Sequence, residues 1–230
     1  MSSVRISNYS SLSKITKLVV CILLIEILVE LIVLTSDYSE IRLVNSVLKK
    51  ELEYSDMLSQ IEINDVRVSI IGTVQFPILV LSSVLFFYWF YRAYRNLSSL
   101  GAIGLTFSPK WLVAYFFIPV VCLWKPYEAL KEIWKVGDPN RLSEGYSWRS
   151  VIVPHILLIW WVTFVISNIM GTFLLTGSLR AELIEDWIKL DIQDIAASIV
   201  IIISDALLIY IIRKINSRQE TKNSNLALLV

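Results

Sequence analysis

The chain is poor in charge, and this absence excludes several classes of protein. Only 18% of its 230 residues are charged and 56% are hydrophobic, whereas about 25% are charged in an ordinary soluble domain. This balance argues against a soluble globular protein and excludes a disordered one. With only seven glycines and six prolines, the chain is neither collagen-like nor a linker. Its net charge of +1 gives no excess that would favour nucleic acid as a partner.

The chain also has few residues for metal or catalytic chemistry. Its single histidine, His155, has too few partners for a structural zinc site. Cys21 and Cys122 lie in apolar stretches, where a cysteine usually behaves as a small hydrophobic residue. The sequence has no Walker A loop, no dinucleotide-binding fingerprint and no H-E-x-x-H motif. We therefore expect no enzyme, no cofactor and no metal site.

What the chain does have is four long apolar segments, at residues 18–34, 68–91, 151–175 and 195–212. Each has about 17 to 25 residues, which at 1.5 Å per residue can cross a hydrocarbon core about 30 Å thick. Backbone polar groups in hydrocarbon must bond to one another, so each segment should be a helix. The sequence predicts an all-α membrane protein whose four transmembrane helices form two hairpins within one domain over residues 1–215.

A fifth apolar stretch, within residues 108–135, is shorter. Its apolar part has 14 residues and contains Pro119, and a proline there would break or kink a helix. This length favours an interfacial or re-entrant segment. A full span over residues 108–124 remains the alternative. Residues 127–135 have the pattern of a short amphipathic helix.

Basic residues are concentrated on one side of the predicted spans. The N-terminal tail, residues 92–149 and the residues after 212 hold 15 of the 21 lysines and arginines. The other two connections hold six basic residues and eleven acidic ones. The positive-inside rule then places both termini and the middle connection in the cytoplasm. Residues 216–230 are polar and are expected to form a flexible cytoplasmic tail.

The first outer connection, residues 36–67, has a helical pattern of its own. Apolar residues recur at three- and four-residue spacing from Ile41 to Leu52, and charged residues lie off that stripe. The pattern predicts an amphipathic outer-loop helix, with Ser36 or Asp37 as its N-cap.

Three acidic residues, Glu26, Glu30 and Asp205, lie inside the predicted spans. Each costs about 2.5 to 3.5 kcal/mol at a helix centre, and no lysine or arginine inside the four spans can pair with them. One interpretation is structural, with neutral acids hydrogen-bonded to serines or backbone. The other is a proton or cation path, which would make the protein a small transporter or an oligomeric pore.

Residues 87–140 contain an ordered series of short motifs. These are Trp89, Tyr91-Arg92-Ala93, Arg95-Asn96-Leu97, Leu100-Gly101, Ser108-Pro109, Trp111, Phe117-Ile118-Pro119, Leu123-Trp124-Lys125-Pro126-Tyr127 and Glu132-Ile133-Trp134. The series resembles the bacterial membrane proteins grouped as DUF4328. It departs from them at Val121-Cys122, where the family tends to have a small residue followed by Asn. The resemblance implies a bacterial multi-pass membrane protein and no particular activity, and we expect it in the cytoplasmic (inner) membrane.

Aromatic and basic residues gather at the inner end of the second segment. Arg92 and Arg95 are three residues apart and share a helix face just beyond the bilayer edge, among tyrosines that suit a membrane interface. They could simply anchor the protein on anionic headgroups. They could instead line a cytoplasm-facing cavity that binds an anionic ligand or lipid headgroup. The candidate residues for this site are Arg92, Arg95, Asn96, Trp111, Pro119, Lys125 and Pro126.

The leading hypothesis is therefore a non-enzymatic membrane module that binds lipid, an anionic ligand or a protein partner through its cytoplasmic loop. The alternative is the transporter or pore for protons or cations that uses the intramembrane acids. The bilayer itself is an expected partner, a homo-oligomer is a further option, and no nucleic acid is expected.

Overall fold

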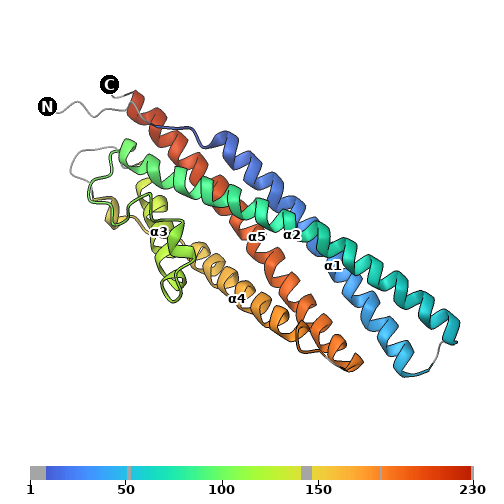
Figure 1. The fold of residues 1–230 in the computed structure, drawn as a ribbon. Helices are drawn as coiled ribbons and strands as arrows, with labels where there is room; N and C mark the ends of the chain where they lie inside the picture. Colours follow the sequence, from blue (N-terminus) through green and yellow to red (C-terminus); the bar gives the residue numbers. More distant parts are fainter. Residues whose placement is uncertain (1–8, 51–52, 141–146, 182, 229–230) are drawn as a thin grey trace. The chain divides into compact units, whose positions relative to one another are not determined.

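The computed structural model describes residues 9–50, 53–140, 147–181 and 183–228, and over these ranges it contains helices and no strand (Figure 1). The α-helices are α1 (Ser13–Leu48), α2 (Tyr54–Ser99), α3 (Lys125–Val136), α4 (His155–Ser178) and α5 (Ile184–Ala227). Single 3-10 turns form η1 (Ala114–Phe116), η2 (Val121–Leu123) and η3 (Trp148–Ser150). Four helices, α1, α2, α4 and α5, are long and apolar enough to cross a membrane. The prediction of four such helices in an all-α protein is confirmed.

Three of these helices are much longer than a bilayer requires. The 36 residues of α1, 46 of α2 and 44 of α5 correspond to about 54, 69 and 66 Å at 1.5 Å per residue. The prediction of a separate outer-loop helix that begins at Ser36 or Asp37 is wrong, because α1 continues through both positions to Leu48. Neither glycine nor proline interrupts α1, so nothing in it stops the helix at the end of its apolar part. Leu52, the end of the predicted stripe, lies outside the described residues.

The chain after residue 215 is helical as well, which corrects the prediction of a flexible tail over residues 216–230. Helix α5 runs to Ala227, and residues 229–230 lie outside the described residues. Gln219 and Lys222 are buried. The Gln219 amide donates to the Ala93 carbonyl at 2.9 Å, and the Lys222 ammonium donates to the Val136 carbonyl at 2.7 Å. The polar side chains of this segment therefore bind backbone oxygens instead of leaving the chain loose in water.

The chain forms two compact units. Unit 1 comprises residues 1–21, 82–161 and 207–230, and unit 2 comprises residues 22–81 and 162–206. Unit 1 has an aromatic core, in which Phe86 of α2 lies 6.1 Å from Trp160 of α4 between ring centroids and 6.0 Å from Phe116 of η1. Trp160 and Trp161 are both buried there, and the Trp161 indole donates to the Leu123 carbonyl at 2.8 Å.

The fifth apolar stretch lies in unit 1 and forms no long helix. The turns η1 and η2 lie on either side of Pro119, and Val120 takes a positive φ of 67° between them. A full span over residues 108–124 is therefore excluded, because the backbone there cannot keep its hydrogen bonds within one continuous helix. Pro126 is in the first turn of α3, where its missing N–H costs nothing. The predicted amphipathic helix at residues 127–135 is confirmed as part of α3.

A buried hydrogen-bonded pair attaches α3 to α2 within unit 1. The Tyr94 hydroxyl donates to Glu132 Oε2 at 2.6 Å and accepts a hydrogen bond from the Phe107 N–H at 2.9 Å. The Thr106 N–H lies 3.3 Å from each Glu132 carboxylate oxygen. Tyr94 is fully buried and Glu132 nearly so. The Tyr94 hydroxyl and the Glu132 carboxylate thus accept hydrogen bonds from the N–H groups of Phe107 and Thr106, in the loop that joins the two helices.

Replacing Tyr94 by phenylalanine tests this pair. Tyr94→Phe leaves the Glu132 carboxylate and the Phe107 N–H each short of a partner, which should lower the free energy of unfolding by about 1–3 kcal/mol. Thermal unfolding of the purified protein in detergent measures the loss. Tyr210→Phe is the matched control, because Tyr210 is half exposed, and it should change stability by about 0.5 kcal/mol or less. Equal stability of the two variants would contradict the role given to the Tyr94 hydroxyl.

Candidate functional site

The two arginines predicted to share a helix face line a hollow of about 270 Å³ in unit 1. Its wall consists of Ser10, Tyr88, Tyr91, Arg92, Arg95 and Asn96. Five of these six residues come from α2 at spacings of three and four, so they share one face of that helix. Ser10, from the segment before α1, provides the remaining side.

The Arg92 guanidinium is held in place at this hollow. Its Nη2 donates to the Ser10 hydroxyl and to the Ser11 carbonyl at 2.9 Å. The central guanidinium carbon, Cζ, lies 5.6 Å from the centre of the Tyr88 ring, within the range of a cation–π contact. A guanidinium has five N–H donors, and the bonds to Ser10 and Ser11 use one nitrogen. Arg95 is exposed at the rim, so the two cations together can bind a phosphate or carboxylate.

Asn96 holds the N-terminal segment against α2. Its Oδ1 accepts a hydrogen bond from the Ser10 N–H at 3.1 Å, and its Nδ2 donates to the Ser10 carbonyl at 2.9 Å. A second bond from Nδ2 reaches Gln219 Oε1 at 3.3 Å. Both amide atoms are thus occupied by protein, and Asn96 is fully buried. Its geometry suits a positioning role at the hollow rather than contact with a ligand.

A carboxylate of α5 completes this attachment. Glu220 accepts hydrogen bonds from the Ser11 hydroxyl at 2.6 Å and the Leu12 N–H at 3.0 Å, beside the first turn of α1, where negative charge is favourable. Burial is the main cause that raises the pKa of the Tyr9 phenol above its ordinary value. The negative charge of the Glu220 carboxylate raises this pKa further. Tyr9 therefore stays neutral and adds no negative charge beside Arg92.

The other four candidate residues do not line this hollow. Lys125 forms an ion pair with Glu128 at 3.4 Å, and its ammonium lies 5.3 Å from the centre of the Phe107 ring. Trp111 and Pro119 are exposed, and Pro126 is buried in α3. The structure therefore groups Arg92, Arg95 and Asn96, and it gives Lys125 partners from its own helix and loop.

Glu30, one of the three intramembrane acids, is buried in unit 2 and hydrogen-bonded by two other helices. Gln75 of α2 donates to its Oε1 at 3.0 Å, and Ser198 of α5 donates to its Oε2 at 2.6 Å. Glu26 is half-buried. Asp205 is half-buried too, and its Oδ2 has no hydrogen-bond partner among the described residues. The contacts of Glu30 are those that the structural interpretation expects for this one acid.

Sequence reasoning missed several polar residues that prove central. Glu132 is buried, although from the sequence it had no role beyond its place in the Glu132-Ile133-Trp134 motif. Its spacing from Ala129 and Val136, which share the buried face of α3, was a usable signal. Gln75 and Ser198 had no such signal, because they lie 45 and 168 residues from Glu30 in the sequence.

Removal of one donor to Glu30 tests whether this contact holds the helices together. Ser198→Ala should lower stability by about 0.6 kcal/mol, the average for hydrogen bonds between membrane helices, and by no more than about 1.7 kcal/mol, the largest value. Ser167→Ala is the matched control, because the Ser167 hydroxyl donates to Phe164 of its own helix at 2.8 Å. Thermal unfolding in detergent should separate the two variants, and a loss as large in the control as at Ser198 would contradict the interpretation.

Comparison with known proteins agrees with the resemblance seen in residues 87–140. A family model described as "Domain of unknown function (DUF4328)" matches residues 54–217, a region that covers most of the chain and includes the Arg92–Arg95 hollow except for Ser10. No curated protein and no solved structure matches the chain. Because this match covers most of the chain, the chain belongs to the DUF4328 family.

Proposed function

We propose that this protein is a non-enzymatic, multi-pass membrane module that binds a phosphate-bearing anionic headgroup in the Arg92–Arg95 hollow. The observation that carries the proposal is the hollow itself. Two guanidinium groups and two tyrosines from one face of α2 line it, and Ser10 closes its side. Arginine is suited to phosphate because its planar fork can donate two parallel hydrogen bonds.

The position of the hollow along α2 supports a lipid source for this anion. Arg92 and Arg95 directly follow the apolar segment that ends at residue 91, the level at which headgroups meet a spanning helix. The excess of basic residues in the tails and the middle connection favours a cytoplasmic location for both termini and the hollow. The anionic lipids of a bacterial inner membrane are then the nearest ligands.

Residues 108–124, the segment before α3, have the exposed apolar side chains of an element that lies in the membrane interface. Several of the segment's large apolar residues are exposed, with Trp111 at 60%, Phe117 at 70% and Val120 at 63%. Aromatic side chains of this kind are favourable at the headgroup level. We assign residues 108–124 to the interface rather than to a re-entrant loop, because two single 3-10 turns leave many backbone groups that need water or protein partners.

The alternative, a proton or cation path through the intramembrane acids, has weaker support. Both Glu30 carboxylate oxygens accept hydrogen bonds from neighbouring helices. The Arg92–Arg95 hollow is not lined by Glu26, Glu30 or Asp205. A binding module requires no water-filled route to these acids.

Substitution of Arg95 tests the proposal with the least disturbance, because Arg95 lies at the rim while Arg92 also holds Ser10 and Ser11. Arg95→Ala should weaken binding of phosphatidylglycerol about fivefold, since one basic contact near the surface contributes about 1 kcal/mol. Titration of the delipidated protein, followed by native mass spectrometry, measures this affinity. Arg213→Ala removes an exposed positive charge elsewhere and should leave it unchanged.

A second titration identifies the source of the phosphate group. Competition by inorganic phosphate at millimolar concentration would indicate a site for a free anion, whereas a lipid site should bind phosphatidylglycerol with little competition. Unaltered binding of both probes by Arg95→Ala would contradict the proposed function.

A further inference from the structure

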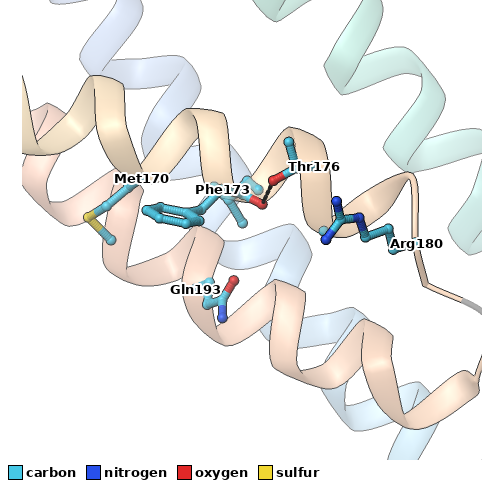
Figure 2. A pocket seen from close by; sticks show the side chains of 7 residues that line it. Met170, Phe173, Thr176, Arg180 and Gln193 are labelled. Carbon is cyan, nitrogen blue, oxygen red and sulfur yellow. Dashed lines mark hydrogen bonds between the residues drawn. The ribbon is translucent and has the colours of Figure 1, made fainter.

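A second hollow lies in unit 2 between α4 and the first part of α5. It is a groove of about 430 Å³ lined by Met170, Phe173, Leu174, Thr176, Gly177, Arg180 and Gln193 (Figure 2). Its volume falls within the ~300–1,000 Å³ typical of small-molecule sites. None of its residues belongs to the Arg92–Arg95 hollow, so it is a separate feature.

The two helices meet closely at the floor of this groove. A Cβ atom at Gly177 would lie 2.7 Å from Leu190 Cδ2, so the absence of a side chain lets α4 and α5 approach each other there. The Thr176 hydroxyl donates to carbonyls of its own helix, Thr172 and Phe173, each at 3.0 Å. The Thr176 hydroxyl proton is therefore already used within α4.

The lining changes from apolar to cationic along the groove. Met170 and Phe173 lie toward one end and Arg180 lies at the other, with Gln193 contributed by α5 (Figure 2). Arg180 lies two residues after Ser178, the last residue of α4, and is exposed. The helix rises about 12 Å from Met170 to Ser178. The apolar end thus falls within the predicted span over residues 151–175, and the cation falls just beyond it.

This order of groups is that of a phospholipid at the edge of a bilayer, with acyl chains in the hydrocarbon and a phosphate at the surface. We propose that the groove binds one anionic glycerophospholipid. An acyl chain packs against Met170, Phe173 and Leu174, while Arg180 binds the phosphate and Gln193 hydrogen-bonds beside it. Charge complementarity favours this occupant, because the exposed Arg180 guanidinium lies at the end of the groove beyond the predicted span and can donate hydrogen bonds to a phosphate.

Two substitutions test the site with phosphatidylglycerol and phosphatidylcholine as probes, each titrated into the delipidated full-length protein and followed by native mass spectrometry. Arg180→Gln should bind phosphatidylglycerol about fivefold more weakly and lose its preference over phosphatidylcholine. Arg42→Gln, at another exposed arginine of unit 2, should keep that preference. Thr176→Trp should fill the groove and remove one lipid-binding step, whereas Thr176→Ser should retain it.

The outcomes separate this site from the Arg92–Arg95 hollow. Arg95→Ala should preserve the binding step that Arg180→Gln weakens. If lipid binding at the Arg92–Arg95 hollow is disproved, lipid binding in the groove can therefore still be tested, and the reverse also holds. Wild-type lipid binding by both Arg180→Gln and Thr176→Trp would overturn the proposal. A dimer that dissociates in Thr176→Trp would also overturn it, because a second copy of the chain would then occupy the groove. If Thr176→Trp does not fold, the lipid preference of Arg180→Gln decides alone.

Discussion

Glu30 is buried among apolar helices, where an unmatched polar group is costly. Gln75 and Ser198 supply its hydrogen bonds from α2 and α5. One residue of an α-helix corresponds to about 100° of rotation, so a shift of register in either helix would carry the donor away. Apolar packing cannot fix that register as firmly, because lipid tails are as apolar as the helix surfaces. The contact therefore sets how three helices of unit 2 align.

Unit 1 relies on the same principle away from its aromatic core. Tyr94 and Glu132 join α2 to α3, Asn96 binds the backbone of Ser10, and Gln219 binds the Ala93 carbonyl. Each bond links segments that are distant in the sequence, so together they fix the N-terminal segment and the last turns of α5 on α2. Arg92 and Arg95 are left on the remaining face of α2, where their charge is available to an anion.

The features that the sequence predicted are those that depend on local pattern. Apolar length determines the four long helices, and the three-residue spacing of Arg92 and Arg95 determines their shared face. Helix ends were harder, because charged stretches such as residues 36–48 and 213–227 look like connections yet contain no helix breaker. Partners for buried polar groups could not be predicted, since Glu30 and Ser198 are 168 residues apart. Lys125 was grouped with the arginines by charge alone, whereas Glu128 and Phe107 hold it elsewhere.

We propose that Glu30 serves helix packing and that function lies in the anion-binding Arg92–Arg95 hollow. Cysteine accessibility tests this division most directly, using Ser198→Cys in a protein in which Cys21 and Cys122 are replaced by alanine. Added to the protein in detergent, a water-soluble thiol reagent should leave residue 198 unmodified while it labels an exposed control, Ser98→Cys, to completion. Labelling of residue 198 as fast as the control would show that water reaches Glu30, which would contradict the account and favour a transport path.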